Sequence, residues 1–320
     1  MSKQSLSLAY IVGIGHSGST LLELLLNRNV DIAAMGEINL FNLQLFRNEN
    51  TRWVGKCSCG KRPFDCPVWS NVIRTFETRH GVDLKLDPFR RSVGDVGLEK
   101  EYGRKAVFDW LTNRWHRAVR TLAYNSSPAI LKPFDLYYRL MIQRRDEIIR
   151  SYAEQQDAGI VVDASKDPLR ICDLQQYSEI PTKILFLTRD VRGFAWSGIK
   201  KRREDARSAA AKWAHVNGKC LNMLKNVNGD SWRHVKYEDL CSNHEGELDR
   251  IFQFLGVENR TIDPADEYRK RHTIAGNRIR FRRLDHVVPD NDWKRRLSAR
   301  EIEQIADVAG TFADRLGYDL

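Results

Sequence analysis

The sequence has no long apolar run, and none of its apolar stretches approaches the ~20 residues that a helix needs to cross a bilayer. The N-terminal residues 1–7 also lack the positively charged start, long apolar core and cleavage site of a secretory signal. We therefore expect a cytoplasmic protein with no transmembrane segment.

Cysteine is scarce, with six residues in the chain, but three of them are clustered as Cys57, Cys59 and Cys66. Three thiolates could hold zinc with His80 as a distant fourth ligand, or two could form a disulfide. Neither spacing is the usual one, and free thiols are the commoner state in a cytoplasmic chain. We therefore expect no metal and no metal requirement.

Nucleic-acid motifs, such as paired zinc fingers or an aromatic RNA-binding strand, are also absent. The net charge of +10, from 52 Lys and Arg against 42 Asp and Glu, still favours anionic ligands. At 320 residues, 42% of them hydrophobic, the chain can bury a substantial core. We expect no nucleic-acid partner and a single domain over residues 1–320; the oligomeric state stays open.

The most informative stretch runs from Tyr10 to Leu26, where an apolar segment breaks into glycines and hydroxyls before a leucine-rich segment. This pattern predicts a buried strand, an anion-binding loop and a helix. The loop consists of Gly13, Gly15, His16, Ser17, Gly18, Ser19 and Thr20. Its glycines let backbone amides approach a ligand, and its hydroxyls stand at the positive end of the helix.

Three ligands fit this loop. Gly13-x-Gly15-x-x-Gly18 matches the dinucleotide fingerprint, but neither Asp31 nor Glu37 ends an apolar strand as the ribose-binding acid should. The same letters resemble a nucleoside-triphosphate loop in which Ser19 replaces the lysine. The third ligand is a simple phosphate or sulfate group, and a glycine-rich turn with no ligand is the remaining alternative.

Charged and polar residues follow further apolar segments. Lys166 comes after residues 160–162, Arg189 after 184–188, and Tyr237 after 232–236. Ser197 lies two helical turns beyond Arg189, with Lys201 one turn further on the same face of a helix expected over 191–203. Arginine and serine together suit a phosphate. Strands that alternate with helices predict an α/β fold, a three-layer sandwich with a central parallel sheet covered by helices on both faces.

The least regular region is residues 41–127, which we expect to form a helical and irregular cap near the acceptor site. A helix expected over 99–124 carries a basic face that includes Arg120, and such a face is usually solvated. Glu37 could serve as a general base, although by its position alone a helix-capping or exposed acid is the better interpretation. Lys166 could equally be a surface lysine paired with Asp163 or Asp167.

Taken in order, the motifs resemble the sulfotransferase superfamily, and among its branches bacterial enzymes related to the tyrosylprotein sulfotransferases. The matching pieces are residues 16–20, Met35-Gly-Glu37, 165–168, 187–197, Lys212-Trp213, 236–240 and Gly276-Asn-Arg-Ile-Arg280. The resemblance implies a P-loop-like fold and a metal-independent, in-line transfer of a sulfuryl group from 3′-phosphoadenosine 5′-phosphosulfate (PAPS) to a hydroxyl or amine.

The resemblance also assigns roles. Glu37 would be the acceptor's general base, and Lys166 would stabilise the departing charge. His16, Ser17, Gly18, Ser19 and Thr20 would bind the 5′-phosphosulfate; Arg189, Ser197 and Lys201 the 3′-phosphate; Tyr237 would line the nucleotide pocket, and Gly276, Asn277 and Arg280 would form a closing loop. The acceptor would be a small molecule, a glycan or a lipid, and the sequence contains no peptide-substrate signature.

Two departures from the family pattern stand out. His16 occupies the position of an Arg or Lys in relatives, so its charge depends on pH. Met35 and Ala164 replace cysteines of the secretory relatives, as expected for a cytoplasmic enzyme. Two alternative functions remain: a P-loop-type nucleotide kinase or NTPase with a degenerate loop, and a non-catalytic nucleotide-binding protein.

Overall fold

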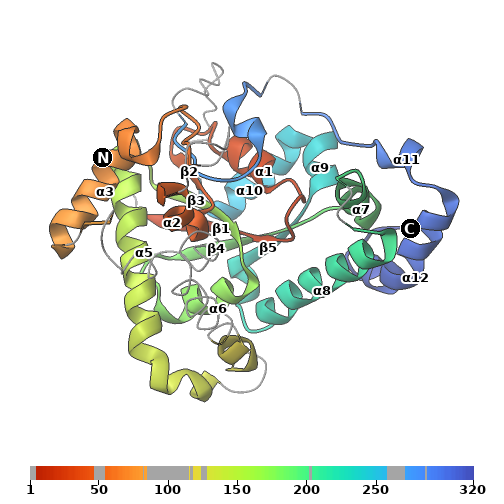
Figure 1. Cartoon of the computed structure of the whole chain (residues 1–320), viewed down its shortest axis with the longest axis horizontal. Coiled ribbons are helices and arrows are strands. Elements are labelled where there is room, and N and C mark those ends of the chain that lie inside the picture. Colours follow the sequence, from red (N-terminus) through yellow and green to blue (C-terminus); the bar gives the residue numbers. More distant parts are fainter. Residues whose placement is uncertain are drawn as a thin grey trace.

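A computed structural model describes residues 5–46, 55–81, 83–84, 115, 118–123, 128–201, 204–257, 271–284 and 287–320. Its centre is a five-stranded parallel sheet in the order β2-β3-β1-β4-β5 (Figure 1). The strands are β1 Ser7–Gly13, β2 Ile32–Gly36, β3 Ile160–Lys166, β4 Thr182–Thr188 and β5 Trp232–Lys236. The predicted α/β fold with a central parallel sheet is confirmed.

Successive side chains along a strand point to opposite faces of the sheet, and each face packs into its own hydrophobic core. Tyr10 of β1 packs into the core on one face of the sheet, and its neighbour Ile11 packs into the core on the other. Helices α5, α6, α8 and α12 contribute to the first core, and α1, α9 and α10 to the second. Because both faces are covered, the central strands are apolar on both sides, as parallel strands usually are.

The helices are α1 Ser19–Leu26, α2 Phe41–Phe46, α3 Pro67–His80, α5 Asp135–Gln156, α6 Pro168–Tyr177, α7 Val191–Ile199, α8 Ala206–Leu224, α9 Tyr237–Ser242, α10 His244–Leu255, α11 Trp293–Arg296 and α12 Ala299–Arg315. Short 3-10 segments are η1 Ile38–Leu40, η2 Pro63–Asp65, η4 Pro128–Phe134, η5 Gly229–Ser231 and η7 Arg278–Phe281. In the described ranges, no helix is long and apolar enough to cross a membrane.

Local sequence explains several boundaries. Asp167 caps α6 by accepting a hydrogen bond from the Leu169 amide at 3.0 Å, and Pro168 occupies the first helical position. Helix α7 ends at Ile199, so the helix expected over 191–203 is too long, and Lys201 lies in the turn that follows. The cationic run that begins at Lys200 offers no apolar residue with which to continue a buried helical face.

Much of the region from 41 to 127 lies outside the described residues, so its expected role as a cap stays a prediction. Its described part is firmly attached, because Trp69 of α3 packs against Tyr152 of α5 in the main core. The expectation of a solvated basic face is wrong for Arg120, which is buried and forms an ion pair with Asp173. A buried guanidinium needs such a partner to offset its lost hydration.

Candidate functional site

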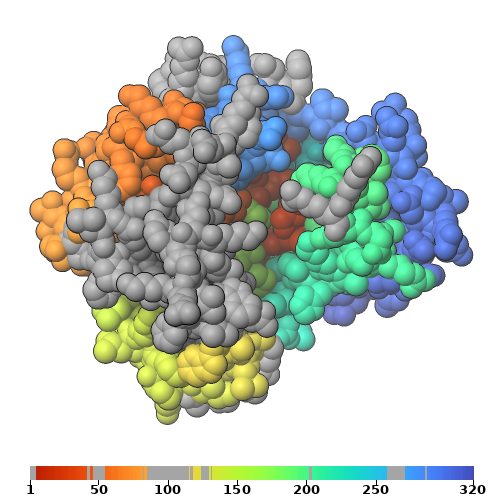
Figure 2. All heavy atoms as spheres, in the orientation of Figure 1, coloured from red at the N-terminus to blue at the C-terminus, as the bar shows by residue number. Residues whose placement is uncertain are grey.

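The predicted site residues meet at one edge of the sheet. The carboxyl ends of parallel strands lie together, and each of the five strands ends in one of these groups. The groups are Glu37 after β2, Lys166 at the end of β3, the glycine-rich loop after β1, Arg189 after β4 and Tyr237 after β5. In Figure 2 the N-terminal segment, drawn in red, is visible at the bottom of a hollow between blue C-terminal and green central segments.

The loop between β1 and α1 has the backbone of an anion-binding turn. His16 and Gly18 have φ values of 70° and 92°, and the first turn of α1 follows at Ser19. A side chain at position 18 would meet the Tyr237 ring at 2.5 Å, so glycine is required there. The Ser17 hydroxyl is buried and has no hydrogen-bond partner among the described residues. A buried, unpaired hydroxyl beside a helix N-terminus is suited to an anionic ligand.

Arg189 lies beside this loop. Its guanidinium donates to the His16 carbonyl at 3.3 Å and to the Asp290 carbonyl at 3.1 Å. It also forms a 3.3 Å ion pair with the Asp290 carboxylate and lies 4.6 Å from the centre of the Tyr237 ring. The Tyr237 hydroxyl accepts a hydrogen bond from the Asp290 amide. The Arg189 guanidinium therefore already binds one anion, a carboxylate from the same chain.

The two other predicted phosphate ligands lie next to this group. The Ser197 hydroxyl donates to the Gly193 carbonyl at 3.1 Å, and a Cβ at Gly193 would lie 3.0 Å from the Arg189 Nε. This contact puts Ser197 one helical turn beyond the residue that packs on the guanidinium. The Lys201 Nζ is 3.3 Å from the His16 Nε2, so the Lys201 side chain lies beside the loop.

The segment 276–280 contacts the loop directly. The Asn277 amide donates to the Thr20 hydroxyl at 3.0 Å, and Gly276 leaves room for that hydroxyl, which a Cβ would approach to 3.0 Å. Arg280 donates to the Gly276 carbonyl at 2.8 Å and to the Lys56 carbonyl at 3.2 Å. The predicted closing segment and the predicted anion loop are thus joined by a hydrogen bond.

Glu37 and Lys166 form an ion pair with 2.6 Å between Oε1 and Nζ, and their side chains are 16% and 14% exposed. The alternative partners of Lys166 are wrong, since Asp163 pairs with Arg145 at 2.9 Å and Asp167 caps α6. Lys166 itself has a φ of 65°, an uncommon conformation for a side chain other than glycine, which re-aims the end of β3.

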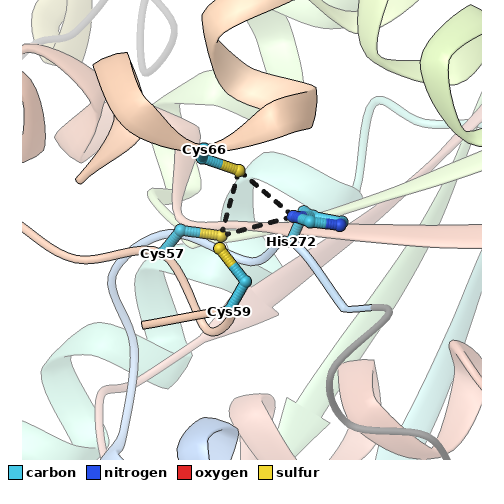
Figure 3. A group of neighbouring side chains, drawn as sticks. All are labelled: Cys57, Cys59, Cys66 and His272. Carbon is cyan, nitrogen blue, oxygen red and sulfur yellow. Dashed lines mark hydrogen bonds between the residues drawn. The ribbon is translucent and has the colours of Figure 1, made fainter. Parts of the chain in front are cut away.

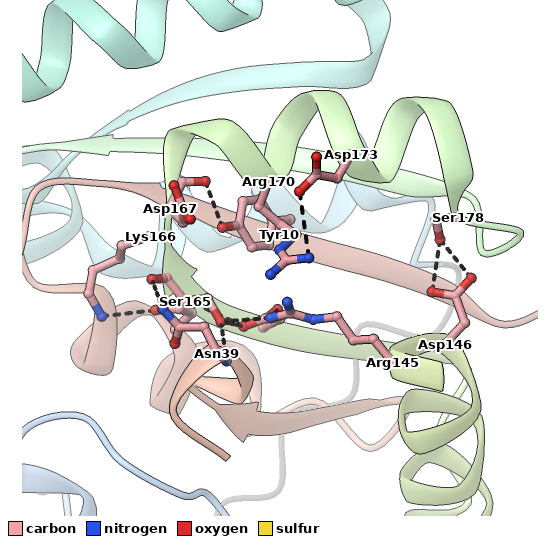
Figure 4. Close-up of polar contacts among 12 residues, drawn as sticks. Tyr10, Asn39, Arg145, Asp146, Ser165, Lys166, Asp167, Arg170, Asp173 and Ser178 are labelled. Atoms are coloured by element: carbon pink, nitrogen blue, oxygen red, sulfur yellow. Dashed lines mark hydrogen bonds and ion pairs between the residues drawn. The ribbon is translucent and has the colours of Figure 1, made fainter. Parts of the chain in front are cut away.

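A buried polar network supports this pair (Figure 4). Arg145 of α5 donates to Asp163 and, at 3.1 Å, to the Ser165 hydroxyl. The Ser165 hydroxyl accepts from the Asn39 amide at 3.1 Å, and the Asn39 side chain donates to the Ser165 carbonyl at 3.2 Å. Because Asn39 and Ser165 are close neighbours of Glu37 and Lys166 in the chain, this network sets the separation of the ion pair.

Glu23 is a site residue that the sequence analysis missed. It lies on α1, one turn after Thr20, and is fully buried; neither carboxylate oxygen has a hydrogen-bond partner among the described residues. Burial raises its pKa to about 8; the Lys166 cation opposes this shift and the Glu37 carboxylate adds to it. Its sequence signal was a lone acid inside a leucine-rich helix.

The structure also corrects the argument used against dinucleotide binding. Glu37 does follow a strand, β2, contrary to the expectation that no acid ends an apolar strand there. However, β3 lies between β1 and β2, so Glu37 is not on the strand adjacent to the glycine loop. It is also paired with Lys166. A ribose-binding role is therefore still unsupported, but for a different reason.

The cysteine cluster likewise differs from the expectation. His80 is not the fourth member of the cluster. Its Nε2 contacts the Glu147 carboxylate at 2.5 Å. Instead, His272 is grouped with Cys57, Cys59 and Cys66. The chain separation of more than 200 residues concealed this partner.

Together, the five-stranded parallel sheet and the glycine loop at its carboxyl edge define an α/β protein of the P-loop-like class. The sulfotransferase family model matches residues 9–261. The chain therefore belongs to the sulfotransferase family and is a transferase. The finer resemblance to the tyrosylprotein branch stays a prediction.

Solved structures agree with this fold. The sulfotransferase domain of the Synechococcus PCC 7002 olefin synthase is 19% identical, with a TM-score of 0.50, over 100% of this chain and 98% of that one. The sulfotransferase domain from the curacin biosynthetic pathway is 15% identical, also with a TM-score of 0.50, over 99% of both chains. At these identities the likeness supports the fold, and the predicted fold is confirmed.

Proposed function

We propose that this protein moves a sulfuryl group from PAPS to a hydroxyl or amine of a small-molecule, glycan or lipid acceptor. The observation that carries the proposal is the 2.6 Å pair between Glu37 and Lys166 at the sheet edge that also holds the glycine loop. It brings together a base for the acceptor and a cation for the leaving group.

The residues present fit the donor. The loop amides and the buried Ser17 hydroxyl are suited to the 5′-phosphosulfate, with His16, Gly18, Ser19 and Thr20 completing that subsite. We assign the 3′-phosphate to Arg189 and Ser197, where it would replace the Asp290 carboxylate on the guanidinium. The Lys201 ammonium adds positive charge beside His16.

The remaining residues would contact the nucleotide part of the donor. Tyr237, between Gly18 and Arg189, would line the nucleotide pocket. Gly276, Asn277 and Arg280 would close over the loop, to which the Asn277 amide is already bonded through Thr20. The segment that carries these residues is far from the loop in sequence, and these contacts hold it next to the loop in space.

The donor supplies a sulfuryl group on a phosphate leaving group, and the chain's residues handle the proton and the charge. Glu37 accepts the proton of the acceptor as the new bond to sulfur forms. Lys166 stabilises the negative charge left on the 5′-phosphate as its bond to sulfur breaks. The ion pair holds the Glu37 carboxylate in place before the acceptor binds.

The test is calorimetric titration with 3′-phosphoadenosine 5′-phosphate, without added metal and beside ATP and NAD. We expect tight binding of the bisphosphate alone and a weakening of at least tenfold in Arg189→Ala. Arg207→Ala is the matched control, because Arg207 forms an exposed pair with Asp307 at 2.9 Å. Binding of ATP or NAD in place of the bisphosphate would overturn the proposal and favour the kinase or dinucleotide alternatives.

A further inference from the structure

Four side chains with metal-binding atoms, three thiols and one imidazole, meet in the described part of the chain. Cys57, Cys59, Cys66 and His272 each offer one ligand atom, and these atoms all lie within 4.8 Å of one another (Figure 3). Cys57 and Cys66 are completely buried, and His272 is 8% exposed. Cys59 is half-buried. Three thiols and an imidazole grouped in this way, most of them away from water, suit a bound cation better than simple packing.

The distances among three of the four ligands are close to those of a tetrahedral metal site. The Cys57 and Cys66 sulfurs are 3.7 Å apart, and the His272 Nδ1 lies 3.8 Å from the first and 3.1 Å from the second. Around a zinc ion with Zn–S bonds of about 2.3 Å, tetrahedral geometry puts two sulfurs about 3.8 Å apart and a sulfur and a nitrogen about 3.6 Å apart. A disulfide would need the two sulfurs about 2.05 Å apart.

The backbone presents the ligands as a built site. The turn Cys57-Ser-Cys59-Gly60 is closed by the Gly60 amide on the Cys57 carbonyl at 2.8 Å, and Gly60 has a φ of 88°. The Cys66 amide donates to the Arg62 carbonyl at 2.8 Å. The His272 carbonyl is held by the Trp69 indole at 2.5 Å, which fixes the imidazole against the sulfurs.

We propose that Cys57, Cys59, Cys66 and His272 bind one structural zinc ion. Three sulfur donors and one nitrogen complete a four-coordinate site, which leaves no open position for a substrate. Binding forms three Zn–S bonds and one Zn–N bond and releases the protons of thiols that were protonated. This assignment replaces the expectation that the cysteines hold no metal.

The ion would join two distant segments next to the site. His272 is two residues before Ile274, whose amide donates to the Met35 carbonyl at 3.1 Å and whose carbonyl accepts from the Glu37 amide at 3.0 Å. The segment then continues to Gly276 and Asn277, which contact the anion loop. The zinc ion therefore anchors both the backbone of Glu37 and the closing segment; this consequence rests on the proposed function.

Elemental analysis of the full chain, purified under reducing conditions, tests the metal directly. We expect one zinc ion per chain, and a loss of at least tenfold in zinc content in Cys66→Ser and in His272→Ala. Cys172→Ser is the matched control, because Cys172 is a free thiol outside the cluster that contacts Met223, and it should keep its zinc. Purified chain without zinc, chain with iron instead, or intact-mass evidence for a Cys57–Cys66 disulfide would each overturn the assignment.

Cobalt substitution tests the site in the wild-type protein, so the result does not depend on whether a variant folds. Wild-type protein refolded with Co²⁺ should show the thiolate-to-cobalt absorption and the visible bands of a tetrahedral site; their absence would contradict the geometry. Zinc content is measured without the donor, so a protein that holds zinc but does not bind the bisphosphate would refute the proposed function and leave this site intact. If both hold, a chelator should weaken bisphosphate binding as well as lower the melting temperature.

Discussion

At the scale of single residues, the pair of Glu37 and Lys166 carries the proposed chemistry. We expect Glu37→Gln to lower kcat by about 10²- to 10⁴-fold, the usual contribution of a general base. Lys166→Met should also lower kcat, because the cation that stabilises the leaving group is removed. Steady-state kinetics with calorimetry of bisphosphate binding separates the two steps.

Binding of the bisphosphate should change little in Glu37→Gln, since a proton acceptor acts on the acceptor substrate. Glu303→Gln, on the exposed side of α12, is the control and should retain wild-type turnover. If Glu37→Gln and Lys166→Met both keep wild-type turnover while the bisphosphate still binds, neither residue performs the proposed chemistry.

Glu23 should make stability depend on pH. Its pKa is raised by burial to about 8 from 4.5, so the folded chain binds a proton that the unfolded chain releases between these values. The unfolding free energy contributed by this group is therefore fully present below about pH 4.5 and is lost as pH rises towards 8. Glu23→Gln mimics the protonated form and removes this dependence.

The measurement is the melting temperature of wild type and Glu23→Gln from pH 5 to pH 8.5. We expect the melting temperature of Glu23→Gln, relative to that of wild type, to increase as pH rises. Parallel profiles would show that Glu23 does not titrate in this range. Other groups titrate in both proteins and cancel in the difference, provided that they lie outside the Glu23 environment.

At the scale of elements, the network between α5 and β3 positions the end of β3. Arg145 and Asp163 are both fully buried, so removing one partner leaves an uncompensated charge. We expect Arg145→Met to lower the unfolding free energy by about 3–5 kcal/mol, and the double variant with Asp163→Asn to lose less than the sum of the single variants. Urea denaturation measures both.

Arg139→Met on the same helix is the control. Arg139 forms an exposed pair with Asp135 one turn away, at 3.2 Å, and such pairs contribute about 0.3–0.5 kcal/mol. An equal loss in the two arginine variants would mean that the Arg145 network does not hold β3. Strictly additive single and double variants would mean that Arg145 and Asp163 act separately.

Element identity followed well from the sequence, because apolar runs and helical periodicity are local signals. The predicted positions of the strand ends were less exact. Residues 160–162 were expected as the strand, but β3 continues through Lys166, because Asp163 and Ser165 satisfy their polar groups with Arg145 and Asn39 inside the protein. Such partners come from other elements and are not visible in a local window.

At the scale of the whole molecule, the positive charge and the bisphosphate site should act together. At a ligand concentration 100 times its Kd, 3′-phosphoadenosine 5′-phosphate should stabilise the fold by about 2.7 kcal/mol, since it binds the folded chain only. With a net charge of +10, the shift in melting temperature should shrink as salt is added.

AMP, which lacks the 3′-phosphate, is the matched ligand control and should give a smaller shift. The Arg189→Ala variant should narrow the difference between the two ligands, because the guanidinium recognises the 3′-phosphate. Equal shifts for both ligands in the wild-type protein would remove the 3′-phosphate subsite from the proposal.

The sequence by itself determined the strand–loop–helix at residues 10–26, the alternation of strands and helices, and the positions of Lys166, Arg189 and Tyr237 at strand ends. These features depend on glycine geometry and on periodicity within a few turns of chain. The tertiary structure alone decided that Lys166 pairs with Glu37, that the Asp290 carboxylate pairs with Arg189, and that Glu23 is buried. It also decided that His272, and not His80, joins the cysteines. The physical reason is that burial and pairing between residues far apart in the chain are set by how its elements pack, and short-range sequence patterns do not encode that packing.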